Sequence, residues 1–244
     1  MPTLLWRGIN TSAVKFKRIF MSQHQHYRHL ALIAAMALFM QSLDATILNT
    51  ALPAISASLN ESPLEMQMTI ISYSLTVALF IPLTGWIADK YGTLNVFRAA
   101  VGIFVLGSVA CAMANSLNAL IWSRILQGMG GALMMPVARL TIIRNVPKTQ
   151  LVAAWNAMAM AGLIGPVLGP IVGGWLVTHA TWHWIFLINI PIGVLGILFA
   201  GRYMPNSTGK INKLDWRGFI LFAGGLAGVT LGLDLLSEER VNPG

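Results

Sequence analysis

Charged residues are scarce in this 244-residue chain: only 10% are Asp, Glu, Lys or Arg, against roughly 25% in an ordinary soluble domain. Hydrophobic residues make up 56%, and the mean hydropathy is +0.68. A composition so poor in charge excludes a soluble enzyme, so we expect no catalytic activity. Cysteine is almost absent as well. With Cys111 alone, the chain can form no intrachain disulfide and no cysteine-based metal site.

Acidic residues are the rarer charge, with 8 Asp and Glu against 16 Lys and Arg, which gives a net charge of +8. In a soluble protein this excess would suggest nucleic-acid or anionic-surface binding. Here fourteen of the sixteen basic residues fall on one side of the predicted spans. The positive-inside rule makes that side, together with the amino terminus, cytoplasmic. The excess therefore reflects orientation in a cell (inner) membrane, and we expect lipid but no nucleic acid as a partner.

Seven long apolar runs account for most of the chain. Each is long enough to cross a bilayer core of about 30 Å as a helix. A membrane β-barrel would instead show alternating segments of about 10 residues. The sequence therefore predicts an all-α membrane protein with about seven transmembrane helices. They are expected at 30–51, 66–88, 99–115, 118–139, 152–178, 184–204 and 218–236.

The first 29 residues contain no uninterrupted signal-peptide core and are predicted to be a cytoplasmic tail. The tail carries His24, His26 and His29. A spacing of two or three residues in a tail is more often incidental than metal-binding, so we expect no metal site. A cytoplasmic loop, the seventh helix and a truncated end are expected over 205–244.

Two ionisable residues fall inside predicted spans, Asp44 in the first and Arg124 in the fourth. Burying such a group costs about 2.5 to 3.5 kcal/mol even on the lenient insertion scale, so it usually faces a partner or a cavity. At about 1.5 Å per residue, both lie ~21 Å from the cytoplasmic side. The two opposite charges therefore share a depth in the membrane.

Two interpretations of this pair remain open. It is either a structural ion pair that holds two helices together, or a protonatable carboxylate tuned by burial and a guanidinium, as a proton relay requires. Gln41 and Gln127 lie three residues from Asp44 and Arg124 and extend the same polar faces. We therefore expect a polar-lined cavity between the first and fourth helices.

The fifth span combines small residues at intervals of four with proline. Gly165, Gly169 and Gly173 leave one helix face bare, so a neighbouring backbone can approach closely. Pro170 favours bending, and Gly174 adds another small residue. Tight packing is expected, and a hinge role remains open.

Several segments resemble motifs of the major facilitator superfamily, and more narrowly of its fourteen-span drug:proton antiporter branch. LDATILNTALP resembles the branch's LDxTIVNVALP signature. GWIADKYG resembles the superfamily's GxxxD(R/K)xG loop, and RILQGMGG resembles the RxxQGxGG motif. WHWIFLINIPIG resembles the branch's WRWIFxINxPxG segment, and the fifth span resembles its antiporter motif. LDATILNTALP and WHWIFLINIPIG are most like the corresponding segments of MdtD-like multidrug resistance proteins. The segments occupy 43–53, 85–92, 124–131, 182–193 and 165–174.

The resemblance implies that the first and fourth helices line a central cavity, with Asp44 as the protonated carboxylate and Arg124 as its coupling partner. Gln41, Asn49 and Gln127 become candidates for the cavity wall. It further implies that 30–204 forms the six-helix amino-terminal half of a facilitator fold, built from two inverted three-helix repeats and followed by the first linker helix.

The resemblance also implies a cytoplasmic latch in the loop after the second span. Its candidate residues are Gly85, Asp89, Lys90 and Gly92, with Arg139 reaching the same membrane face. Thr93-Leu94-Asn95 replaces the family's usual basic pair here, which predicts a weaker latch.

The function implied is proton-coupled efflux of amphipathic or cationic drugs by alternating access, driven by the proton gradient and without a cofactor. Such a transporter needs a carboxyl-terminal half that 244 residues cannot contain. Two alternatives remain, a facilitator for a single metabolite and a truncated fragment that transports nothing.

Overall fold

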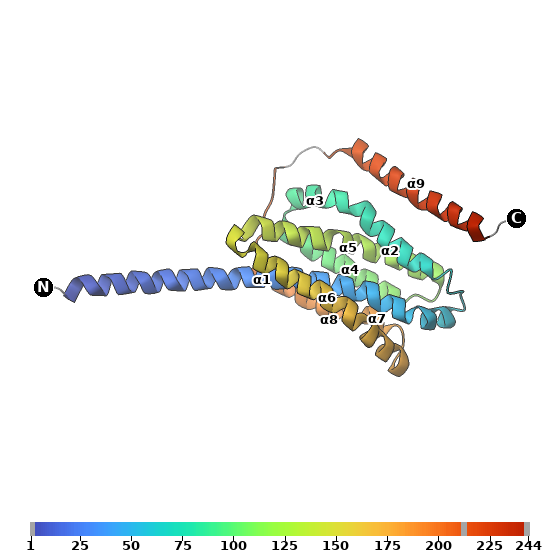
Figure 1. Cartoon of the computed structure of the whole chain (residues 1–244), viewed down its shortest axis with the longest axis horizontal. Helices are drawn as coiled ribbons and strands as arrows, with labels where there is room; N and C mark the ends of the chain where they lie inside the picture. The colour runs from blue at the N-terminus through green and yellow to red at the C-terminus, as the bar shows by residue number, and fades with distance from the viewer. Residues whose placement is uncertain (1–2, 211–213, 242–244) are drawn as a thin grey trace.

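The computed structural model describes the backbone of residues 3–210 and 214–241, and side chains from Tyr27 to Val229 with gaps at 211–213 and 227 (Figure 1). All regular structure in these ranges is helical. The α-helices are α1 (Thr3–Leu59), α2 (Gln67–Phe80), α3 (Thr84–Tyr91), α4 (Thr93–Ala112), α5 (Leu117–Asn145), α6 (Lys148–His179), α7 (Trp184–Leu187), α8 (Asn189–Tyr203) and α9 (Trp216–Val241). A 3₁₀ turn, η1 (Ile81–Leu83), joins α2 to α3.

Six stretches of the described chain are long and apolar enough to cross a membrane, and they confirm the first six predicted spans. They run from residue 27 to 59, 67 to 91, 93 to 112, 117 to 145, 148 to 179 and 184 to 203. The seventh predicted span falls within α9, whose side chains after Val229 lie outside the described residues.

The helices lie side by side in one bundle (Figure 1). Helix α1 packs against α6, α4 against α5, and α8 against both α1 and α4, while α2 lies on α5. Helix α9 lies along the α2 and α3 edge, and the first part of α1 projects beyond the bundle. The bundle therefore brings α1, α4, α5 and α8 together at its centre.

Helix α1 is longer than the sequence predicts. The sequence predicts a span that begins at residue 30, and the helix that contains this span runs unbroken from Thr3 to Leu59, through most of the predicted tail. Between Thr3 and Leu30 the sequence contains one glycine, Gly8, and no proline. A single glycine costs a helix only about 1 kcal/mol relative to alanine, which does not end it. Among the described side chains of α1, Leu30 is buried in the core of the bundle and Tyr27 packs against that core.

Two predicted spans are broken where proline interrupts the backbone hydrogen bonds. Pro82 lies in η1 and cannot donate to a carbonyl one turn earlier, so the second span divides into α2 and α3. In the sixth span, Pro191 leaves the carbonyl of Leu187 without its helical donor, and the chain divides at Ile188 into α7 and α8.

The core consists of two apolar clusters stacked along the bundle. One contains Met40, Phe104 and Met134, and the other contains Ile47 and Leu120. Between them lies a layer of buried polar side chains. We call it the polar layer and define it as Asp44, Ser108, Arg124, Gln127 and Asn189, all at most 1% exposed.

Candidate functional site: a buried ion pair in a polar layer

An ion pair between α1 and α5 forms the centre of the polar layer. Arg124 donates from Nη1 to Asp44 Oδ2 over 2.7 Å, and each side chain is 1% exposed. The shared depth predicted from the sequence therefore corresponds to direct contact. Because both charges are removed from water, each depends on the other for compensation.

Gln127 links the two members of the pair. Its Nε2 donates to Asp44 Oδ1 over 2.8 Å, and its Oε1 accepts a hydrogen bond of 2.6 Å from Arg124 Nη1. Arg124 and Gln127 are three residues apart on α5, so both side chains project from the same helix face. The amide therefore has one defined orientation, with its oxygen toward the guanidinium.

Two further residues complete the layer from α4 and α8. Asn189 Nδ2 donates to Asp44 Oδ1 over 3.1 Å and lies 3.3 Å from Ser108 Oγ, which also accepts from Gln127 Nε2 over 2.9 Å. Sequence reasoning placed Asn189 in a motif without assigning it a role, and missed Ser108. The available signal was a polar residue within an apolar span, which is costly unless it has a partner.

Arg124 keeps other partners besides Asp44. Its Nε donates to the Thr69 carbonyl over 3.3 Å, and its guanidinium lies 4.2 Å from the centroid of the Tyr73 ring. A cation over an aromatic face gains about 2 kcal/mol when both are desolvated. The guanidinium is thus held by α2 as well as by α1 and α5.

The expected polar-lined cavity between the first and fourth helices is not what the structure shows at these residues. Asp44, Arg124 and Gln127 are fully buried in a closed hydrogen-bond network. Gln41 instead joins the two helices, donating to the Gly131 carbonyl over 3.1 Å. Asn49 is exposed and lies outside the polar layer, because it occupies a different face of α1 from Asp44.

Asp89, a residue of the predicted latch, forms an ion pair with Arg144 at the end of α5. Arg144 Nη2 lies 2.5 Å from Asp89 Oδ1. Arg139, the other candidate partner on α5, instead has its guanidinium 5.9 Å from the centroid of the Trp155 ring. Lys90 extends over the Trp86 ring, with its Nζ 4.7 Å from the centroid. Arg144 lies about 1.4 turns beyond Arg139 on α5, at the helix end where Asp89 lies.

The chain after α8 covers the latch loop where the basic pair is replaced. Asn206 Oδ1 accepts from the Leu94 amide over 3.1 Å at the start of α4, and the Gly209 amide donates to the Asp89 carbonyl over 3.2 Å. Gly92 has a φ of 86°, and a Cβ there would collide with the Asn206 side chain. Gly85 is exposed, with open space around its Cα.

The glycine face of α6 packs against α1. Cβ atoms at Gly165 and Gly169 would meet Ser42 and Thr46, and one at Gly173 would lie 2.9 Å from the Ile47 side chain. Helix α6 contains Pro170, which is exposed, without a break. Gly174 lies off this face and has open space. The close approach of backbones explains the glycine spacing.

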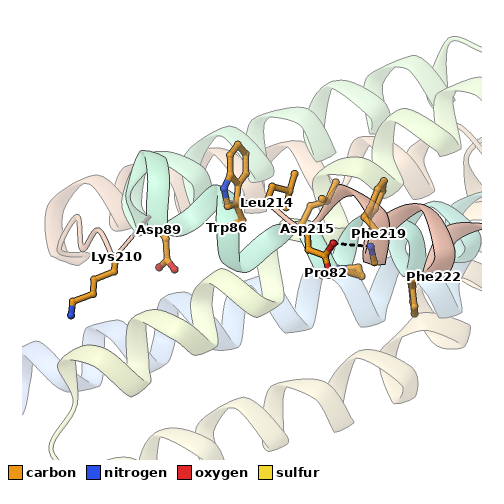
Figure 2. Close-up of a pocket in the computed structure, with 10 residues that line it drawn as sticks. Pro82, Trp86, Asp89, Lys210, Leu214, Asp215, Phe219 and Phe222 are labelled. Carbon is orange, nitrogen blue, oxygen red and sulfur yellow. Dashed lines mark hydrogen bonds between the residues drawn. The ribbon is translucent and has the colours of Figure 1, made fainter. Parts of the chain in front are cut away.

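A separate cavity of about 450 Å³ lies between α3, α9 and the segment joining α8 to α9 (Figure 2). Its wall is mainly apolar and includes Trp86, Phe219 and Phe222. Asp89 at its edge is paired with Arg144, and Asp215 accepts from the Gly218 amide over 2.9 Å. The described residues contain no group of three potential metal ligands.

A bundle of membrane-length helices around a buried ion pair is the architecture of a multi-pass transport protein. The family model of the Major Facilitator Superfamily matches residues 34–218, and the chain belongs to this superfamily. It is 71% identical over 216 residues to "Probable transport protein HsrA" of Haemophilus influenzae, a match covering 88% of this chain and 47% of that protein. It is 51% identical over 211 residues to "Putative multidrug resistance protein MdtD" of Salmonella dublin, covering 86% and 45%.

Solved transporter structures share the fold. The proton:xylose symporter XylE superimposes with a TM-score of 0.69 at 14% identity, covering 91% of this chain and 55% of that chain. The peptide transporter POT gives a TM-score of 0.65 at 18% identity, covering 89% and 46%. This chain therefore spans about half the length of the relatives it matches. Both the superfamily and the resemblance to MdtD that the motifs predict are confirmed.

Proposed function

We propose that this chain is the amino-terminal half of a proton-coupled efflux transporter for amphipathic or cationic drugs, with Asp44 as the proton carrier and Arg124 as its coupling partner. The observation that carries the proposal is the 2.7 Å ion pair at 1% exposure. The name of the 51% identical relative supports drugs as the substrate class. The name of the 71% identical relative indicates transport but no substrate class.

The network around Arg124 explains how the pair can be opened and closed. When a proton neutralises Asp44, the guanidinium loses its counter-ion but keeps the Gln127 oxygen, the Thr69 carbonyl and the Tyr73 ring. A buried cation that retains hydrogen bonds is far less costly than a bare one. Arg124 can therefore stay in place through a protonation cycle.

Coupling follows from competition for the Asp44 carboxylate. In the closed pair Oδ2 is occupied by Arg124 and Oδ1 by two amides, so the carboxylate is not open to a substrate. A conformational change that separates α1 from α5 would expose it to a proton from one side of the membrane or a cationic drug from the other. Exchange of the proton for the drug at this carboxylate is antiport.

The latch belongs to the same proposal. We assign the end of the bundle that holds Asp89 and Arg144 to the cytoplasm of a cell (inner) membrane, with the amino terminus on the same side. There the latch orders the loop between α3 and α4 against the end of α5. Its dissociation would accompany opening toward the cytoplasm.

The exposed faces of α2 and α6 are where we place the second half of the transporter. The relatives are about twice as long as this chain, and a central cavity requires walls from both halves. Asn49, exposed on α1, then becomes a cavity-wall residue in the complete transporter.

The test is drug export from cells or inverted vesicles containing the full-length transporter. A panel of lipophilic cations and neutral amphiphiles should reveal compounds whose ATP-independent export stops when a protonophore collapses the proton gradient. Failure with every amphiphile, combined with export of one polar metabolite, would replace the drug assignment with the facilitator alternative.

A further inference from the structure

The Asn189 amide is half satisfied at a buried position. Its Nδ2 donates toward Asp44 Oδ1 over 3.1 Å and Ser108 Oγ over 3.3 Å. Its Oδ1 has no hydrogen-bond partner, although the residue is 0% exposed. Buried polar atoms without a partner are rare, so this oxygen calls for a physical reason.

The ionised Asp44 explains the present orientation. An ionised carboxylate only accepts hydrogen bonds, and its neighbours Arg124, Gln127 and Asn189 all present donors to it. A protonated carboxyl group must also donate one. With the neighbours as they stand, the new O–H would face N–H groups alone.

Of these three neighbours, Asn189 is the one that can supply an acceptor. Arg124 has none. Gln127 is held by its 2.6 Å bond from Arg124 to its Oε1, and turning it would set its NH₂ group against the guanidinium. Asn189 is free of this constraint, because its Oδ1 has no hydrogen-bond partner. After a 180° turn about Cβ–Cγ, Oδ1 would face Asp44 and Nδ2 would take the place where Oδ1 now lies. Its orientation is therefore decided by Asp44 and Ser108.

We infer that Asn189 is a positioning residue for proton coupling, whose amide donates Nδ2–H to ionised Asp44 and rotates to accept the O–H of protonated Asp44 at Oδ1. This rests on the proposed role of Asp44 as proton carrier. One proton is added at Asp44 Oδ1, and no other group loses one. The other titratable or charged groups facing Asp44 are Arg124 from α5, Tyr73 from α2 and Cys111 from α4.

The rotation also gives Ser108 a new role. In the present orientation Ser108 Oγ accepts from both amides, Gln127 and Asn189. After the rotation its O–H can donate to Asn189 Oδ1, because a hydroxyl turns to suit its neighbours. The end of the Asn189 amide that faces Asp44 and Ser108 is therefore hydrogen-bonded whether Asp44 is ionised or protonated.

Infrared spectroscopy of the purified chain in lipid nanodiscs tests the inference without any transport assay. The C=O stretch of protonated Asp44 is identified as the carboxylic-acid band that grows on acidification and is lost in Asp44→Asn. We expect Asn189→Leu to move this band to higher wavenumber, because the O–H loses its acceptor. Ser108→Ala, which leaves the amide in place, is the matched control and should leave the O–H bonded. Asn189→Ala replaces Asn189→Leu if the larger side chain prevents folding.

The outcomes separate the two claims. An Asp44 band that is present but unshifted in Asn189→Leu and Asn189→Ala would overturn the amide switch and leave the proton carrier intact. If acidification yields no band that Asp44→Asn removes, Asp44 does not take up a proton, which overturns the carrier and the switch together.

Discussion

Asp44 and Arg124, 80 residues apart in the chain, meet in one 2.7 Å hydrogen bond at a depth where neither side chain is more than 1% exposed. Apolar clusters lie on both sides of this contact along the bundle. The pair is therefore isolated from water in the closed bundle, and its charges are balanced locally.

Removing one member of the pair should destabilise the bundle more than removing both. Arg124→Gln leaves an uncompensated carboxylate, and breaking a buried pair in this way costs about 3–5 kcal/mol. Adding Asp44→Asn should recover much of that loss. Thermal unfolding of the chain in nanodiscs measures the order of stability. Arg98→Gln, at an exposed arginine, is the control and should be close to wild type.

Equal stability of Arg124→Gln and the double variant would contradict local charge compensation. It would mean that Asp44 is neutral in the folded chain, so that no carboxylate is stranded by the loss of Arg124.

The first six spans and the Asp44–Arg124 contact could be predicted from the sequence, because run length and buried charge are local signals and helix rise converts position to depth. The partners supplied by α4 and α8 could not. Ser108 and Asn189 reach Asp44 only through the packing of four helices, which no spacing within one helix reveals.

The partner of Asp89 in the latch could likewise not be predicted from the sequence. Arg139 and Arg144 lie on one helix near one end of the bundle, and only the tertiary position of α3 decides that Arg144 meets Asp89. The covering segment after α8 likewise depends on where α8 ends. Sequence spacing therefore predicts the end of the bundle at which these arginines lie but not which of them pairs with Asp89.

The glycine face of α6 predicts opposite signs for two alanine substitutions. Gly169→Ala should destabilise the chain by about 1–3 kcal/mol, since the added Cβ overpacks against Thr46 and its Cβ atom at 2.8 Å. Gly174→Ala meets nothing within 4 Å and should gain up to about 1 kcal/mol of helix propensity. Thermal unfolding of both variants checks this, and a stabilising Gly169→Ala would show that α1 and α6 pack less closely.

The latch should respond to Arg144 and not to Arg139. Arg144→Gln removes the partner of Asp89 and a contact with the Ser207 carbonyl, and a partly exposed pair contributes about 0.2–1 kcal/mol. We expect hydrogen exchange at the Gly209 amide to rise by up to about fivefold, because that amide donates to Asp89. Arg139→Gln is the matched control and should leave this exchange unchanged. An equal rise in both variants, or no rise in Arg144→Gln, would contradict the assignment of the latch to Arg144.

The turn before α2 should depend on pH through Glu65. Hydrogen bonds to the carboxylate from the Ser62 backbone and side chain hold the pKa of Glu65 below its ordinary value. A lowered pKa in the folded turn means that the stabilisation is present at neutral pH and is lost as pH falls through that pKa. The Ser62 amide chemical shift, followed by NMR, should titrate at this low pH. Glu65→Gln should remove the titration, and its persistence would assign the change to another group.

The most direct test of the account is proton movement by the full-length transporter in liposomes that carry an internal pH dye. A transported drug added to wild-type vesicles should drive a pH change, and Asp44→Asn should abolish that change. Asp215→Asn, an exposed carboxylate outside the polar layer, is the control and should retain the signal. Undiminished drug-driven proton movement in Asp44→Asn would contradict the assignment of Asp44 as the proton carrier.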